Sequence, residues 1–178
     1  MDEVAQRRAQ VMAEITAATG IDDDLIARLV DTFYARVRLD PELGPIFEGH
    51  VTDWDLHLSQ MRLFWSSVAL MSGRYHGRPM PKHMNLPIDA RHFDRWLTLF
   101  ETVVCEVCQP KAAEHFLERA RRIAENLEYG VATRHGAALE HGERFHNPNL
   151  PAPEAASPAN EAQSDGPQAT RRALGARA

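Results

Sequence analysis

The chain has 178 residues, of which 44% are hydrophobic, and its 20 basic and 25 acidic side chains give a formal net charge of −5. This composition indicates one globular domain with a sizeable core, and the acidic excess argues against nucleic-acid binding, which usually needs a basic patch. No apolar run approaches the roughly 18 residues of a membrane span, and the N-terminus leads into no apolar signal segment. We therefore expect a cytoplasmic protein that binds neither nucleic acid nor membrane.

Three helices are predicted in the first part of the chain, and polar caps or breakers mark their ends. Residues 1–20 indicate a polar N-terminal extension helix. The acidic residues 22–24 suit the start of a second helix, which should end before Pro41. After a short corner, Asp53 can cap a third helix that runs to about Ser72. The second helix has a broad apolar face formed by Leu25, Ile26, Leu29, Val30, Phe33, Tyr34 and Val37.

A loop rich in glycine and proline separates the third helix from the fourth. Its residues, Gly73–Pro87, cannot form a long regular helix. The loop lies between two strongly apolar helical patterns, so it is suited to hold one side chain, His83, in a fixed place. A fourth helix is predicted from about Asp89, and a fifth begins with Pro110, which fits a first helical turn.

The character of the sequence changes near the C-terminus. Residues 141–178 are rich in proline, alanine and small polar residues, and we expect a disordered tail there because so few large apolar side chains can offset the ordering entropy. The rest divides into the extension at residues 1–20 and a domain at residues 21–140. No segment shows a strand pattern, so the predicted fold class is all-α.

Polar-tipped side chains on apolar helix faces are the first candidates for a functional site. Tyr34, His57 and Trp96 lie on three different helices, and each carries an N–H or O–H group. Each of them alone is more simply explained as a core residue bonded to a nearby carbonyl. Together they suggest a polar spot inside an apolar pocket, which is the usual composition of a ligand site. His83 adds a neutral imidazole, a natural ligand for haem iron.

At these residues the sequence resembles the truncated haemoglobins, and among them group III. The resemblance covers about residues 25–131 and consists of an ordered series of blocks. These blocks are Phe33–Arg38, Asp40–Phe47, Asp53–His57, Phe64–Ser67, Gly73–Met80 with His83 after it, and His92–Leu97. The glycine-pair motifs of groups I and II are missing, as expected for group III.

The resemblance implies a truncated globin-like two-over-two helical sandwich that holds haem b. The family's proximal histidine falls on His83, which would be the metal ligand. Its distal tyrosine, distal histidine and ligand-facing tryptophan fall on Tyr34, His57 and Trp96. Phe47 falls where a globin places a phenylalanine against the haem.

Other contacts to the haem are expected from position in the chain. Helical spacing offers apolar walls, and the loop offers groups for the haem propionates. The candidate walls include Phe47, Met61, Trp65 and Phe93, and the candidate propionate partners are Tyr75, Arg78 and Lys82. Covalent haem attachment is disfavoured, because Cys105 and Cys108 are followed by Gln109 where such a motif requires histidine.

The resemblance implies binding of dioxygen, nitric oxide or another small diatomic gas at a five-coordinate iron. An alternative is a haem enzyme for nitric oxide, peroxide or peroxynitrite detoxification, which would need an external reductase to return the iron to the ferrous state. A further alternative, from a different class, is a helical interaction module without a cofactor. The residues alone leave these possibilities open.

Overall fold

The computed structural model describes residues 3–151. Seven helices follow one another in this part of the chain, and it contains no strand. They are α1 (Glu3–Thr19), α2 (Asp23–Leu39), α3 (Leu43–Glu48), α4 (Trp54–Leu70), α5 (Pro79–His83), α6 (Ala90–Val107) and α7 (Pro110–Arg134). The prediction of an all-α fold is confirmed.

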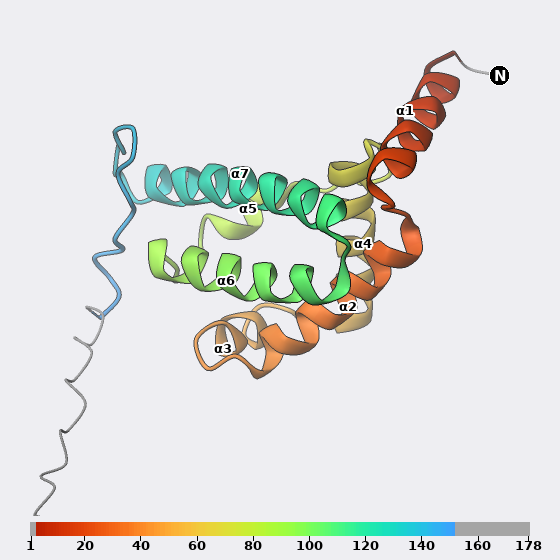
Figure 1. The fold of residues 1–178 in the computed structure, drawn as a ribbon. Coiled ribbons are helices and arrows are strands. Elements are labelled where there is room, and N and C mark those ends of the chain that lie inside the picture. The colour runs from red at the N-terminus through yellow and green to blue at the C-terminus, as the bar shows by residue number, and fades with distance from the viewer. Residues whose placement is uncertain (1–2, 152–178) are drawn as a thin grey trace, which may run out of the picture.

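Two pairs of long helices make up the body. The helices α6 and α7 run antiparallel side by side, and α2 and α4 form a second pair that packs against them (Figure 1). The short helix α5 lies against α7, and α3 lies between α2 and α6 (Figure 1). This arrangement is the two-over-two sandwich that the family resemblance implies. In α1, Met12 and Ile15 pack against the main core.

Aspartates cap α2, α4 and α6 at the predicted places. The carboxylate of Asp22 accepts a hydrogen bond from the Leu25 amide at 2.7 Å, and that of Asp53 accepts one from Leu56 at 2.9 Å. Asp89 starts α6 in a reciprocal cap with His92. Such caps satisfy amides that have no partner within a helix, which is why the helix starts are readable from sequence.

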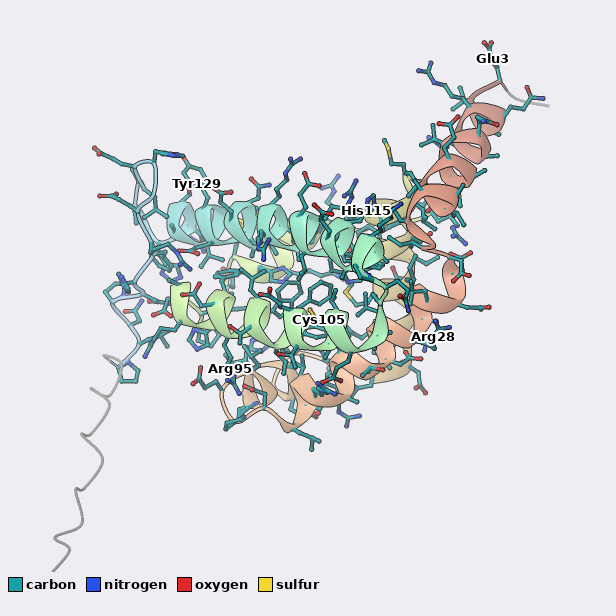
Figure 2. The ribbon with its side chains drawn as sticks, in the orientation of Figure 1. Glu3, Arg28, Arg95, Cys105, His115 and Tyr129 are labelled. Carbon is teal, nitrogen blue, oxygen red and sulfur yellow. The ribbon has the colours of Figure 1, made fainter. Side chains whose placement is uncertain are left out.

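A buried aspartate joins three elements next to the site. Asp40 follows α2, and its carboxylate accepts hydrogen bonds from the amides of Glu42 and Leu43 at the start of α3. Arg95 of α6 donates to the same carboxylate at 2.6 Å and 2.7 Å, and Figure 2 labels this arginine between α6 and α3. Burial raises the pKa of Asp40, but the bonds from Arg95 and the two amides outweigh it and lower the pKa below its usual value. The carboxylate therefore fixes the corner that carries Phe47.

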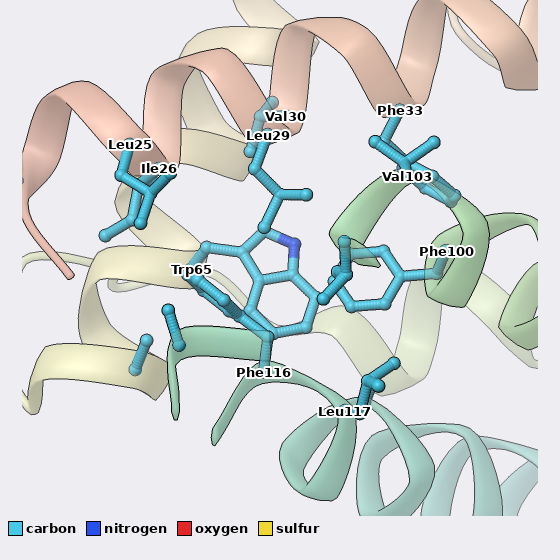
Figure 3. Close-up of a cluster of buried hydrophobic side chains, with 14 of the residues drawn as sticks. Leu25, Ile26, Leu29, Val30, Phe33, Trp65, Phe100, Val103, Phe116 and Leu117 are labelled. Carbon is cyan, nitrogen blue, oxygen red and sulfur yellow. The ribbon is translucent and has the colours of Figure 1, made fainter. Parts of the chain in front are cut away.

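The main core is built from aromatic rings between α4, α6 and α7. Trp65 is only 2% exposed and stacks on Phe100, with centroids 4.9 Å apart, while the edge of Phe116 meets it at 5.7 Å (Figure 3). Aliphatic side chains of α2 surround these rings (Figure 3). Full burial of rings of this size is a large hydrophobic contribution to stability.

A second, smaller core lies at the other end of α7 and includes residues beyond the predicted domain. Phe145 is 2% exposed and packs with Ile88, Phe93 and Val131. This differs from the expectation that the chain makes no packed structure after residue 140, because one phenylalanine and one buried ion pair anchor a segment that is otherwise polar. The remainder of the predicted tail, residues 152–178, lies outside the described residues.

Candidate functional site

The side chain of His83 is fixed by its own short helix. Its Nδ1 donates a hydrogen bond to the carbonyl of Pro79 at 2.8 Å, and that carbonyl can only accept. The remaining ring nitrogen, Nε2, is therefore the unprotonated atom of the neutral imidazole. Burial lowers the pKa of His83, which favours this neutral form. A neutral imidazole with one nitrogen bonded to the backbone is the usual arrangement of a metal-ligating histidine.

The segment before α5 is tied to α4 by hydroxyl groups. The α4 helix ends at Met71 in a left-handed conformation, with φ of 58°. The Ser67 hydroxyl accepts a hydrogen bond from the Tyr75 amide at 2.8 Å. Arg74 donates to Ser66 at 2.5 Å and also pairs with Asp23 of α2. The loop that leads to His83 thus has a set path, although it has little regular structure.

A cluster of four rings lies on the other side of the site. Tyr34 comes from α2, Phe47 from α3, and Trp54 and His57 from α4. The centroids of Tyr34 and His57 are 4.9 Å apart with the rings nearly perpendicular, and those of Trp54 and His57 are 5.6 Å apart. Phe47 lies 5.8 Å from Tyr34 and stacks on Trp54. The structure therefore brings two of the predicted distal residues, Tyr34 and His57, into direct contact.

The predicted tryptophan, Trp96, is connected to Tyr34 through one further ring, that of Phe33. It meets the edge of Phe33, which in turn contacts Tyr34, and it stacks on Phe100 with centroids 5.1 Å apart. Phe100 is therefore held between Trp65 on one face and Trp96 on the other. This stack connects the site to the main core and restricts the orientation of Trp96.

Polar atoms of this ring cluster lack partners. Nε2 of His57 and Nε1 of Trp54 are buried and make no hydrogen bond within the described residues. Burial raises the pKa of the Tyr34 hydroxyl, with a further contribution from the nearby Tyr75, so the hydroxyl stays protonated and can donate. Buried polar groups are normally satisfied, and unpaired ones in a native fold call for an explanation. A ligand that accepts hydrogen bonds provides one.

The two sides of the site are close enough to influence each other electrostatically. The pKa of His57 is lowered, mainly by burial and also by the charges of Lys82 and His83. Lys82 and His83 belong to α5, and His57 belongs to α4. His57 and the candidate iron ligand, His83, are thus near enough for the charge of one to affect the pKa of the other.

The other predicted contact residues are distributed between the site and the core. Phe47 lies in the ring cluster, and Met61 packs half-buried on the main core. Trp65 is covered by Phe100 and Phe116, so its ring belongs to the core. Phe93 faces the smaller core and lines a cavity of about 430 Å³ between α6, α7 and residues 139–144. Their contact with haem stays a prediction.

The three predicted propionate partners lie around α5. Tyr75 is half-buried and meets the edge of Phe64 at 5.3 Å, while Arg78 and Lys82 are exposed. Sequence reasoning did not single out Trp54, whose position one helical turn before His57 could have revealed it. Cys105 and Cys108 are both free, and they lie at the C-terminal end of α6.

Comparison with known proteins identifies the family of this chain. The family model for bacterial-like globins matches residues 17–129. The chain is 34% identical to the group 3 truncated hemoglobin ctb of Campylobacter jejuni over 113 residues, which are 61% of this chain and 89% of that protein. It is 32% identical to the group 2 truncated hemoglobin YjbI of Bacillus subtilis over 89 residues, 49% of this chain and 67% of that protein.

A solved structure gives the same result. The crystal structure of group III truncated hemoglobin from Campylobacter jejuni matches with a TM-score of 0.59 at 34% identity, covering 62% of this chain and 91% of that one. No helix among residues 3–151 is long and apolar enough to cross a membrane. Because the family match spans more than half of the chain and the group 3 relative is matched over most of its length, the chain belongs to the truncated haemoglobins, within group III.

Proposed function

We propose that this protein holds haem b through Nε2 of His83 and binds a diatomic gas, dioxygen or nitric oxide, beside Tyr34, His57 and Trp96. The observation that carries the proposal is a pair of features, one at His83 and one at His57. On one side, His83 has its Nδ1 bonded to Pro79 and its Nε2 left as an electron-pair donor. On the other side, His57 has a buried Nε2 that finds no partner among residues 3–151.

The residues present fit a haem group. The imidazole of His83 has the tautomer that iron requires. Apolar and aromatic side chains of α3 and α4, Phe47 and Met61 among them, give the surroundings that a porphyrin ring needs, and Arg78 and Lys82 offer exposed cations for its propionates. Because Gln109 follows Cys108, the thiols do not form a covalent attachment motif, so the group would be haem b.

The distal side chains have distinct roles toward a bound gas. Haem iron with one protein ligand would supply an open coordination position for the diatomic molecule. Tyr34 donates a hydrogen bond from its hydroxyl, and Trp96 donates one from its indole N–H. Both bonds act in a buried space where electrostatic interactions are stronger than in water. His57 supplies a further nitrogen beside Tyr34, with the two ring centroids 4.9 Å apart. Trp54 contacts the ring of His57 in the same cluster.

The direct test is the absorption spectrum of the protein purified after expression with added haem precursor. We expect a Soret band, a ferrous spectrum of a five-coordinate iron, and extraction of all haem by acidified organic solvent, as for haem b. His83→Ala should lose most of the haem, whereas His76→Ala, an exposed histidine of the same loop, should retain it. Absence of a Soret band in the wild type, or full haem content in His83→Ala with an unchanged ferrous spectrum, would overturn the proposal.

The choice of gas and the role of turnover are addressed by rapid mixing. Tyr34 and Trp96 as donors favour a ligand that carries partial negative charge, which dioxygen does more than carbon monoxide. We therefore expect slow dioxygen release relative to carbon monoxide release, each normalised to a plain globin. Repeated turnover with nitric oxide would need an external reductase as a partner. Turnover that occurs only after a reductase is added would demonstrate this requirement.

A further inference from the structure

We infer that residues beyond the family match position His83: the last turns of α7 and the segment Arg144–Asn147, here called the C-terminal strap. This inference rests on the proposed role of His83 as iron ligand. The family match ends at residue 129. Yet in the part of the chain that follows His83, Asn85, Ile88 and Ala90 are each hydrogen-bonded to a residue numbered above 129.

The strap is hydrogen-bonded directly to the chain that follows His83. The carbonyl of Phe145 accepts a hydrogen bond from the Ala90 amide at 2.8 Å. The side-chain amide of Asn147 donates to the carbonyl of Ile88 at 3.4 Å. In Figure 1 the chain after α7 runs back past the beginning of α6, which places the strap beside these residues. The strap thus fixes the backbone at residues 88–90.

Packing adds to these hydrogen bonds. Phe145 and Ile88 are 2% and 6% exposed and belong to the same small core, against which Leu86 also packs. Leu86 lies three residues after His83, and its amide donates to the His83 carbonyl at 3.0 Å. A shift of Phe145 is therefore transmitted to His83 through Leu86 and a single backbone hydrogen bond.

A buried ion pair holds the strap itself in place. Glu128 of α7 is 5% exposed, and it accepts hydrogen bonds from Nε of Arg144 at 3.0 Å and from the Phe145 amide at 2.8 Å. Arg144 also reaches Asp94 of α6 at 2.7 Å. One arginine therefore bridges α6 and α7 at the end where the strap crosses them, and its planar guanidinium suits this bidentate contact.

The last turns of α7 support α5 from the other direction. Gly130 lies so close to α5 that an added Cβ would stand 2.0 Å from the sulfur of Met80. Arg134 donates to the side chain of Asn85, two residues after His83, at 3.3 Å. The segment 80–90 is thus held at both ends by residues numbered 130 or higher. Loosening of the strap should let the imidazole of His83 move relative to the distal wall.

The test compares the same substitution in the two cores. Phe145→Leu alters the strap, and Phe116→Leu is the matched control, because Phe116 is equally buried but packs on Trp65 in the main core. Phe145→Leu should release haem to an excess of an acceptor globin about tenfold faster than Phe116→Leu. It should also shift the iron–histidine stretching band in the resonance Raman spectrum, which loss of global stability alone does not move.

A second readout uses the haem-free protein. Amide hydrogen exchange of residues 84–90 should quicken in Phe145→Leu and not in Phe116→Leu, when both are compared with wild type. Asn147→Ala is the milder variant if Phe145→Leu does not fold, because it removes only the bond to Ile88 and the one that its Oδ1 accepts from the Asn149 amide at 3.0 Å. Equal haem release, an unmoved stretching band and equal exchange in the two leucine variants would overturn the inference. A wild type without a Soret band would instead overturn the proposed function.

Discussion

The two sides of the site are built in opposite ways. On the distal side, four rings pack together, mostly edge to face, and Nε2 of His57 and Nε1 of Trp54 have no partner in the part of the chain that the structure describes. On the proximal side, both the Nδ1 and the backbone carbonyl of His83 are hydrogen-bonded. Apart from Nε2 of His83, which is left for a metal, the polar groups of His83 are thus already hydrogen-bonded, whereas Nε2 of His57 and Nε1 of Trp54 are not.

The difference has an energetic meaning. A buried polar group without a partner costs about 1–3 kcal/mol, and a ligand that accepts its hydrogen bond returns part of that free energy. The distal wall should therefore be the part of the protein that ligand binding stabilises most. Apart from the bond that Nε2 of His83 would form to iron, the proximal side should change little, because the hydrogen bonds of its Nδ1 and backbone carbonyl already exist.

The largest expected effect comes from removing the two distal donors together. Tyr34→Phe and Trp96→Leu should each speed dioxygen dissociation by about tenfold, since one hydrogen bond in a dry site contributes about 1–1.5 kcal/mol. If both donors bind the same atom, the increase in dissociation rate in the double variant should be smaller than the product of the two single increases. The measurement is stopped-flow displacement of dioxygen by carbon monoxide. Unchanged dissociation in both single variants would show that the distal side is not a donor wall.

A smaller effect is expected from pH on the distal side of the haem-free protein. Burial, Lys82 and His83 lower the pKa of His57 from 6.5, so the unfolded chain binds a proton that the folded chain does not. The contribution of this group to stability is therefore complete above about pH 6.5 and falls as the pH drops toward the lowered value, by at most about 1.4 kcal/mol per pH unit. When the pH is lowered from about 7.5 to about 5.5, the free energy of unfolding measured with urea should fall more for the wild type than for His57→Leu. Equal losses would contradict the prediction, and His141→Ala, an exposed histidine, should match the wild type.

The smallest effect tests the close approach on the proximal side. Alanine usually stabilises a helix by about 1 kcal/mol relative to glycine, but Gly130→Ala forces the Met80 sulfur to move. We expect little or no gain from Gly130→Ala alone and a gain of up to about 1 kcal/mol when it is made in a Met80→Ala background. Urea denaturation of the four proteins of this cycle gives the coupling. An equal gain in both backgrounds would show that the contact does not constrain α5.

Much of the fold was predictable from sequence because its signals are local. Asp22, Asp53 and Asp89 mark helix starts by chemistry that involves only the next three residues. The apolar face of α2, from Leu25 to Val37, follows from helical spacing and is buried as expected. The contact between Tyr34 and His57 depends on tertiary packing, so only the family resemblance could predict that these two residues lie in one site.

The features that sequence reasoning missed depend on contacts between distant residues. Phe145 is an isolated apolar residue in a polar stretch, so only its position against Ile88 reveals it as core. Glu128 looks like a solvent-facing helix residue until Arg144 is placed beside it. Trp65 and Phe93 carry the same helical spacing whether they face a porphyrin or a neighbouring helix, and spacing cannot distinguish the two.

The position of the tryptophans has a practical consequence for observing this protein. The chain has three of them, Trp54, Trp65 and Trp96, and they occupy the distal wall, the main core and the stack that joins the two. Haem absorbs strongly where indole emits, so binding of haem at His83 would quench their fluorescence by energy transfer. The emission of Trp→Phe variants could then report separately on the pocket and on the core, without any attached dye.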